Sequence, residues 1–332
     1  MLKDFSIGHH TDTEKQTGVT AILCPNGATG GVSVRGGAPA THETDLLRSE
    51  NTVEKVNAVV LCGGSAFGLE AISGVMRYLK DQGFGYDAGA YRVPICTGAA
   101  IYDLECGAFA FPDREAGYEA ARLAEPVKET SGRFGAGSGA TVCKLGGMAT
   151  AQPSGLAVVT GKYGELEVAV VVVLNALGNV YDPKTGKAIK EVLPDKKMTS
   201  HANTTIACVL TNATLTKAQA NKLADVTQDA YARCIRPVHT GFDGDSIFVM
   251  ASGKVKADLL ELQMLAQDLC ERAILKAVPV CNCLALRKCY EFIVERITFK
   301  ICISCCLEVS DHDKVLHVCR CVSEKTTAVK EC

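Results

Sequence analysis

The chain is most apolar along Leu166-Glu167-Val168-Ala169-Val170-Val171-Val172-Val173-Leu174, a run rich in valine that is closed by Asn175. Valine is branched at Cβ and packs well on a pleated, buried surface, so this run predicts a strand. Its strongly apolar part, 168–174, is far shorter than the roughly 18 to 20 residues of a membrane-spanning helix. We therefore expect a buried strand in a protein that does not cross a bilayer.

Similar runs lie on both sides of this stretch. Apolar segments bounded by Gly, Pro, Asn or Asp predict further strands over residues 19–24, 56–62, 156–160, 205–211 and 246–251. Apolar stripes at helical spacing predict helices over 69–79 and 262–273. Thr216 and Gln219 have the spacing of a capping box, which predicts the start of a third helix. Strands and helices alternate irregularly, which favours a layered α/β or α+β domain.

Composition and charge exclude several classes of protein. The 332 residues are 47% hydrophobic and 22% charged, which is typical of a globular protein with a large core. Thirty-five basic and 37 acidic residues give a net charge of −2, and no Lys/Arg-rich run is present. Because nucleic-acid binding needs a basic surface, we expect no nucleic-acid partner. The first residues are polar and contain no apolar signal core, so we expect a cytoplasmic protein.

The cysteines separate two parts of the chain. Of 17 cysteines, eight lie in residues 1–280 beside small apolar residues, where we expect buried, reduced thiols. The other nine lie in the last 52 residues, with spacings such as Cys302-Ile303-Ser304-Cys305 that have no clear second pair. A zinc site uses paired units, so we predict no metal. We expect residues 279–332 to be a poorly ordered tail.

Two glycine-rich stretches raise the possibility of nucleotide binding. Gly63-Gly64-Ser65-Ala66-Phe67-Gly68 follows a predicted strand and opens a helix, but it lacks the spacing of a P-loop, of a dinucleotide site and of a nucleophile elbow. We expect a tight turn in which Gly63, Gly64 and Ser65 line a substrate pocket. The stretch 135–140 has no strong strand before it and no acidic residue at the expected distance after it. A nucleotide role is therefore not predicted.

The junction Asn203-Thr204-Thr205 stands where a polar loop meets the predicted strand 205–211. A threonine hydroxyl is a poor nucleophile unless a base removes its proton, and an N-terminal threonine carries such a base as its own α-amine. The reference pKa of that amine, about 7.7 to 8.0, leaves an unprotonated fraction near neutral pH. Cleavage between Asn203 and Thr204 would create this group. An ordinary junction of loop and strand is the alternative.

Other polar residues could complete such a site. Asn175 ends the most apolar run, where its amide could face a developing oxyanion, although a turn-forming Asn is the alternative. Asp243 and Asp245 lie two residues apart just before a predicted strand, so both can point to one face, although Asp-Gly is also a common turn. Lys144 and Tyr102 are single polar residues in apolar surroundings and are uninformative alone.

Five segments, in this order, resemble one family of self-processing peptidases. The family includes β-peptidyl aminopeptidases, D-aminopeptidases and the nylon-oligomer (6-aminohexanoate-oligomer) endohydrolase. The segments are residues 36–45, 61–69, 173–176, 203–205 and 236–245. The endohydrolase branch is the most similar, because Asn203-Thr204 replaces the Gly-Ser of the aminopeptidase branch. The resemblance implies an α+β, four-layer αββα sandwich of the N-terminal-nucleophile-hydrolase type, as in the β-aminopeptidases and ornithine acetyltransferases.

The resemblance also implies roles for the residues. A self-processing peptidase domain of residues 1–278 would be cut into an α chain, 1–203, and a β chain that begins at Thr204, the nucleophile. Asn175 would donate to the oxyanion, Lys144 and Tyr102 would lie beside the nucleophile, and Asp243 with Asp245 would orient it.

On this reading the enzyme would hydrolyse a small peptide or amide without a cofactor, as a homo-oligomer, expected to be a tetramer of αβ units. Two alternatives remain: an acyltransferase of the ornithine acetyltransferase type, and a non-catalytic oligomeric binding relative. The cysteine-rich tail departs from the family.

Overall fold

Strand β13 (Leu166–Asn175) lies within a long hydrogen-bonded ladder in the computed structural model, which describes residues 2–192 and 203–279. The ladder has the order β3-β7-β4-β2-β18-β16-β13-β12-β9, and β1 and β8 extend it from β2. The pairs β4–β7 and β16–β18 are parallel, whereas the other pairs of this ladder are antiparallel. The strand bounds are β1 Ser6–Asp12, β2 Thr17–Val34, β3 Thr41–His42, β4 Lys55–Cys62, β7 Cys96–Ala100, β8 Glu125–Pro126, β9 Thr130–Gly132, β12 Leu156–Tyr163, β16 Thr204–Ala213 and β18 Ser246–Val255.

Strand β2 joins two stacked layers of this ladder. The first part of β2 pairs with β1 and β4, and its last part, residues 29–34, pairs with β18. The register against β4 shifts between Leu23 and Ala28, and such an irregularity bends and twists a strand. The continuous ladder therefore folds over on itself into two sheets.

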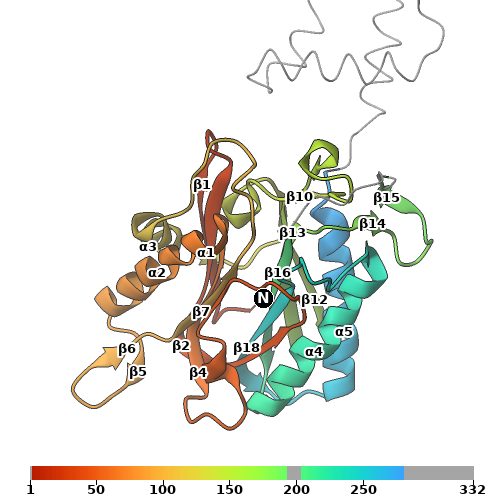
Figure 1. Ribbon diagram of the computed structural model, residues 1–332. Coiled ribbons are helices and arrows are strands. Elements are labelled where there is room, and N and C mark those ends of the chain that lie inside the picture. Colours follow the sequence, from red (N-terminus) through yellow and green to blue (C-terminus); the bar gives the residue numbers. More distant parts are fainter. Residues whose placement is uncertain (1, 193–202, 280–332) are drawn as a thin grey trace, which may run out of the picture. The chain divides into compact units, whose positions relative to one another are not determined.

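Helices cover the outer faces of both layers (Figure 1). Helices α2 (Glu70–Asp81) and α3 (Arg114–Arg122) pack together and lie against strands β1, β2, β4 and β7. Helices α4 (Lys217–Cys234) and α5 (Leu259–Lys276) pack together and lie against β12, β13, β18 and the end of β2. The result is a four-layer arrangement of helices, sheet, sheet and helices.

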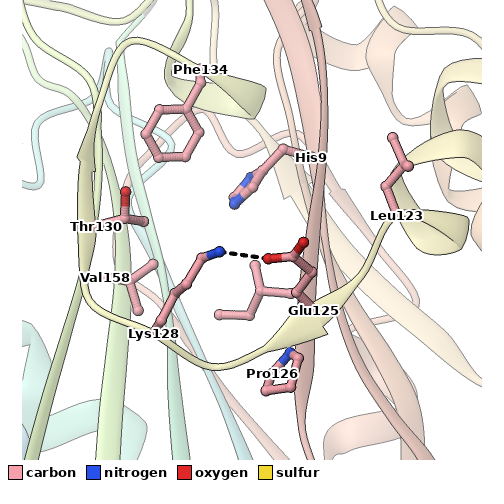
Figure 2. Close-up of a pocket in the computed structure, with 9 residues that line it drawn as sticks. His9, Leu123, Glu125, Pro126, Lys128, Thr130, Phe134 and Val158 are labelled. Atoms are coloured by element: carbon pink, nitrogen blue, oxygen red, sulfur yellow. Dashed lines mark hydrogen bonds and ion pairs between the residues drawn. The ribbon is translucent and has the colours of Figure 1, made fainter.

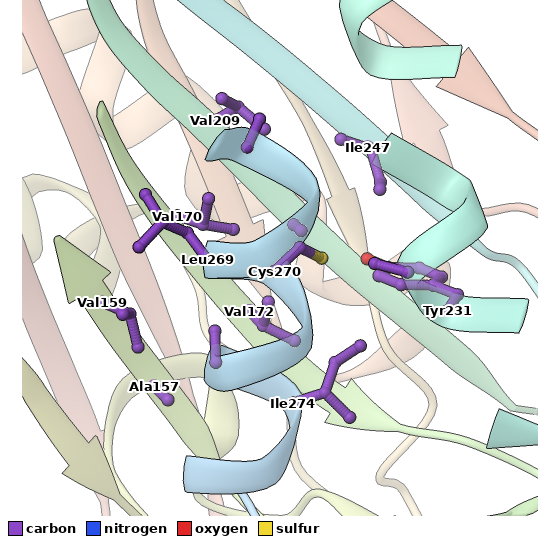
Figure 3. Close-up of a cluster of buried hydrophobic side chains, with 14 of the residues drawn as sticks. Ala157, Val159, Val170, Val172, Val209, Tyr231, Ile247, Leu269, Cys270 and Ile274 are labelled. Carbon is purple, nitrogen blue, oxygen red and sulfur yellow. The ribbon is translucent and has the colours of Figure 1, made fainter. Parts of the chain in front are cut away.

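Among residues 2–192 and 203–279, three apolar cores hold the four layers together, and β13 contributes to two of them. Val170, Val172 and Leu174 face the helices, while Ala169, Val171 and Val173 face the core between the sheets. This alternation follows from the two-residue period of a strand. Figure 3 shows Leu269 and Ile274 of α5 over the first of these faces. The third core lies under α2 and α3.

Shorter elements complete the described part of the chain. They are α1 Ser65–Gly68, β5 Tyr86–Asp87, β6 Arg92–Val93, β10 Thr141–Val142, β11 Gln152–Pro153, β14 Asn179–Tyr181, β15 Ala188–Lys190, β17 Ile235–Arg236 and the 3₁₀ helices Asp45–Leu47, Gly135–Gly137 and Met148–Thr150.

The predicted strands and helices are confirmed, several with longer bounds. Helix α4 begins with the predicted capping box of Thr216 and Gln219. The eight cysteines upstream of residue 280 are buried free thiols, as expected. Within the described ranges, no helix is long and apolar enough to span a membrane. The compact unit ends at Pro279, and the predicted poor order of the tail concerns residues outside the described part.

Candidate active site

The peptide bond between Asn203 and Thr204 lies at the start of β16, and both residues are buried. The Thr204 hydroxyl donates a hydrogen bond of 2.5 Å to the carbonyl oxygen of Asn203. The main-chain N–H of Gly244 donates to the same oxygen at 2.8 Å. This carbonyl is therefore polarised by two donors, and one of them is the predicted nucleophile itself.

Gly244 has to be glycine for this approach. A Cβ atom at position 244 would lie 2.6 Å from the Thr204 Oγ1 atom. Any side chain would therefore push the hydroxyl away from the bond that it faces.

Asn175 is the last residue of β13 and pairs with Thr204 across the ladder. Its Oδ1 atom accepts hydrogen bonds from Lys144 Nζ at 2.8 Å and from the N–H of Thr141 at 3.0 Å. Its Nδ2 atom donates to the carbonyl oxygen of Tyr102 at 3.0 Å. These partners fix the orientation of the amide, which has a second N–H to offer.

Lys144 is fully buried beside Asn175. Burial lowers the pKa of its ammonium group to about 7, although the nearby Cys106, Asp243 and Asp103 oppose this effect. A lysine of this kind is partly neutral near pH 7 and can accept a proton, which an ordinary lysine cannot do.

Asp103 belongs to the same cluster and was missed by the sequence analysis. Its Oδ1 atom accepts from the N–H of Gly64 at 2.6 Å, and its Oδ2 atom accepts from Thr17 Oγ1 at 2.9 Å. Burial raises the pKa of this carboxyl to about 6, while its hydrogen bonds and the charge of Lys144 act in the opposite direction. The signal available in the sequence was an acidic residue directly after Tyr102.

Replacing Asp103 by asparagine tests the electrostatic link to Lys144. The carboxylate is one of the groups that raise the pKa of Lys144, so its removal should lower that pKa further. If Lys144 is the base for the predicted cleavage between Asn203 and Thr204, the rising limb of the pH–rate profile of that cleavage should move to lower pH in Asp103→Asn. An unmoved limb would mean that Asp103 acts only by holding Gly64.

The turn of Gly63, Gly64 and Ser65 is the structural turn that was predicted. Gly64 has a φ of 79°, in the left-handed region that favours glycine. The three N–H groups donate to Gly18 O at 2.8 Å, to the Asp103 carboxylate at 2.6 Å and to Ile101 O at 2.8 Å, respectively. They are therefore engaged within the protein, and a substrate could contact this turn through the Ser65 hydroxyl or a carbonyl oxygen.

Tyr102 meets the site through its main chain. Its carbonyl oxygen accepts from Asn175, whereas its hydroxyl donates to Glu105 Oε1 at 3.0 Å in more exposed surroundings. The described contacts thus link Tyr102 to the oxyanion candidate rather than to Thr204.

Asp243 and Asp245 are both buried next to the predicted cleavage bond. Asp245 Oδ1 accepts from the N–H of Thr205 at 2.8 Å. Burial and then the charge of Asp245 raise the pKa of Asp243 above its ordinary value. His239, which the sequence analysis did not select, contacts Asp245 through its Nδ1 atom at 2.9 Å.

A cavity of about 350 Å³ lies elsewhere, at the edge between the two sheets (Figure 2). His9 and Phe134 line it side by side in a T-shaped contact, with ring centroids 4.7 Å apart, and Lys128 pairs with Glu125. Burial lowers the pKa of His9 to about 4, so this imidazole is neutral at physiological pH. None of the predicted site residues lines this cavity, which separates it from the cluster around Thr204.

The sequence pattern of peptidase family S58 matches residues 2–287. The chain belongs to peptidase family S58. This S58 chain is 38% identical over 303 residues to an uncharacterized aminopeptidase of Mycobacterium leprae, covering 79% of this chain and 82% of that one. It is 29% identical over 272 residues to the 6-aminohexanoate-oligomer endohydrolase of a Kocuria species, covering 75% and 73% of the two chains.

Solved structures confirm the predicted fold class of the S58 chain. An L-aminopeptidase D-Ala-esterase/amidase from Ochrobactrum anthropi, described as a variant of the N-terminal-nucleophile hydrolase fold, matches with a TM-score of 0.66 at 16% identity. It covers 83% of this chain and 84% of that one. A β-aminopeptidase from a Burkholderia species matches over the same shares with a TM-score of 0.61 at 17% identity. The family and its named relatives confirm the prediction of an enzyme of the peptide- or amide-hydrolase class.

Proposed function

We propose that this S58 chain cuts itself between Asn203 and Thr204 and then hydrolyses amide bonds with Thr204 as an N-terminal nucleophile. The observation that carries the proposal is the geometry of the Asn203 carbonyl. Its oxygen lies between the Thr204 hydroxyl and the N–H of Gly244.

Self-cleavage would proceed by transfer of the Asn203 acyl group from nitrogen to oxygen. Thr204 Oγ1 attacks the Asn203 carbonyl carbon while a base, for which neutral Lys144 is the candidate, takes the hydroxyl proton. The Gly244 N–H stabilises the oxyanion, and the Asn175 amide is the candidate for a second donor. The C–N bond then breaks, and the Thr204 nitrogen takes a proton and becomes an amine. Water hydrolyses the resulting ester, which leaves a carboxylate on Asn203 and a free Thr204 hydroxyl.

Turnover repeats the same chemistry on an external amide. The Thr204 amine, with a reference pKa of about 7.7 to 8.0, serves as the base for its own hydroxyl. The hydroxyl attacks the substrate carbonyl, the amine product leaves, and water hydrolyses the acyl-enzyme ester. None of these steps uses a cofactor.

The names of the relatives support a substrate class. We propose a small peptide or a linear amide, because relatives are named aminopeptidase and 6-aminohexanoate-oligomer endohydrolase. We further propose a homotetramer of αβ units in the cytoplasm, which size-exclusion chromatography with light scattering and cell fractionation would test.

Asn175→Ala tests the oxyanion role. We expect self-cleavage and turnover to fall by about 100-fold, the usual cost of one lost oxyanion donor. The measurements are the rate of appearance of the cut chains and the kcat for a p-nitroanilide substrate. Wild-type rates would remove Asn175 from this role.

Intact mass and N-terminal sequencing of freshly purified protein test the function as a whole. The expected result is two chains, one of which begins at Thr204. A single uncut chain with no amide hydrolysis would overturn the proposal.

A further inference from the structure

The residues His239 and Thr240 are consecutive, and each of them holds one of the two buried carboxylates. Thr240 donates to Asp243 Oδ2 through its main-chain N–H at 2.9 Å and its hydroxyl at 2.6 Å. His239 donates to Asp245 Oδ2 through its main-chain N–H at 3.1 Å, and its Nδ1 atom lies 2.9 Å from the same oxygen. Each carboxylate thus receives one main-chain and one side-chain contact from this pair of residues.

This arrangement selects the ring nitrogen of His239 that donates to Asp245. A carboxylate oxygen accepts hydrogen bonds, so Nδ1 carries the proton that faces Asp245. The Nε2 atom is buried, and among the described residues it has no hydrogen-bond partner. The ring packs beside the buried ring of Tyr231 from α4, with centroids 6.1 Å apart. His239 is therefore held as a donor of fixed direction.

The backbone of His239 supports the same conclusion. Its φ is 54°, in the left-handed region that few residues other than glycine adopt, although Asn, Asp and His are enriched there. Such a conformation persists only where surrounding contacts impose it, and it is common at functional sites. Here it lets the main-chain N–H and the ring of one residue reach the same oxygen of Asp245.

Both carboxylates are nearly inaccessible, with 2% of Asp243 and 1% of Asp245 exposed. Buried carboxylates need hydrogen bonds to remain charged, and bonds of this charge-assisted kind are strong and directional. The held segment then contacts the carbonyl of the cleavage bond and the peptide group that follows this bond. Asp245 Oδ1 accepts from the N–H of Thr205, and the N–H of Gly244 donates to the carbonyl of Asn203.

We propose that His239 and Thr240 are positioning residues that act as one clamp, setting Asp243 and Asp245 around Thr204 for cleavage and turnover. The inference rests on the proposed function. It adds two residues that touch neither the scissile bond nor the nucleophile in the described contacts.

Matched pairs of variants isolate each side-chain donor. Thr240→Val removes the hydroxyl and keeps the shape, whereas Thr240→Ser keeps the hydroxyl. His239→Leu removes the ring donor, whereas His239→Asn keeps an N–H near the Nδ1 position and tolerates the left-handed backbone. Thr211→Val is the control, because the buried Thr211 hydroxyl donates to Glu167 O at 3.1 Å. Thr211 lies on the same strand, about 23 Å from Thr204 at 3.3 Å per residue.

Self-cleavage is measured by intact mass, and kcat and KM are measured on the cut protein with a p-nitroanilide. We expect Thr240→Val and His239→Leu to slow self-cleavage and kcat by about 10- to 100-fold, as for a lost bond to a charged group, with KM within about twofold. Thr240→Ser and His239→Asn should recover most of this loss. Thr211→Val should lower the melting temperature without slowing either reaction.

The pH profile provides a readout that a purely structural role would not move. In the described part of the chain, Asp245 and Lys144 are the charged groups near Asp243, and its hydrogen-bond donors include the main-chain N–H of Leu177 and the two donors of Thr240. Loss of the Thr240 hydroxyl removes a hydrogen bond that stabilises the Asp243 carboxylate, so the pKa of Asp243 should rise. The acidic limb of the kcat profile of Thr240→Val should therefore move to higher pH, and Thr240→Ser should restore it.

The outcomes separate the clamp from the function on which it rests. Wild-type protein that neither cuts itself nor hydrolyses amides would end the proposed function. Active wild-type protein with equally active Thr240→Val and His239→Leu would overturn the clamp alone. Equal losses in the members of each pair, with an unmoved pH limb, would also overturn it.

Discussion

Thr204→Ala is expected to remain a single chain of 35.1 kDa and to hydrolyse no amide substrate. The variant lacks the hydroxyl that donates to the Asn203 carbonyl at 2.5 Å. The Asn203 acyl group therefore cannot move from nitrogen to oxygen, and no acyl-enzyme can form with a substrate. The fold should persist, because the alanine methyl group fits where the threonine side chain is buried. Intact mass and a p-nitroanilide assay measure the two reactions.

Thr204→Ser is the matched control. It keeps the hydroxyl and loses one methyl group, so it should cut itself and turn over at a reduced rate. A cut and active Thr204→Ala protein would falsify the assignment of the nucleophile. An inactive Thr204→Ser protein with unchanged melting temperature would show that the methyl group is needed to orient the hydroxyl.

Lys144→Met is expected to lower self-cleavage by about 100-fold or more, within the range of a lost general base. Methionine fills a similar volume in this buried position without a basic nitrogen. In the wild type, the pKa of about 7 means that the neutral amine accumulates as the pH rises through that value. The cleavage rate should therefore increase over this range and level off above it.

Lys144→Arg distinguishes the role of Lys144 as a proton acceptor from its role as a positive charge beside Asn175. Arginine stays protonated at all accessible pH values, so it should keep a cation beside Asn175 and lose the rising limb of the profile. Self-cleavage is followed at several pH values from about 5 to 9, by quenching samples over time and measuring the uncut and cut chains by mass spectrometry. A rising limb near pH 7 in Lys144→Arg would assign that limb to another group.

Local patterns predicted much of the fold and part of the site. The valine run of β13 and the capping box at Thr216 each lie within a short stretch of sequence, so they could be recognised without knowing which distant segments pack against them. The pairing of Thr204 with Asn175 could not, because it depends on the register of two strands separated by a loop. The bend of β2 between the two layers could not be predicted from the sequence either, since it depends on pairing with strands far along the chain.

The residues that were missed share one property, which is that they act through contacts between distant segments. Asp103 accepts a hydrogen bond from the N–H of Gly64. Gly244 acts through its main-chain N–H, which donates to the Asn203 carbonyl and which no side-chain pattern reveals. His239 matters because its unusual backbone brings two donors to Asp245. Tyr102 was selected for its hydroxyl, yet the structure connects it to Asn175 through its carbonyl.

The strand order β2-β18-β16-β13 has a consequence for the cut protein. Strands β16 and β18 belong to the part of the chain that begins at Thr204, whereas β2 and β13 precede it, so two strands of the second product chain would lie between strands of the first. The uncut chain unfolds and refolds as one molecule. The cut protein would separate into two on unfolding, and its recovery would then depend on their concentration. After cleavage, refolding would thus require two chains to associate, and its yield would fall as the protein is diluted.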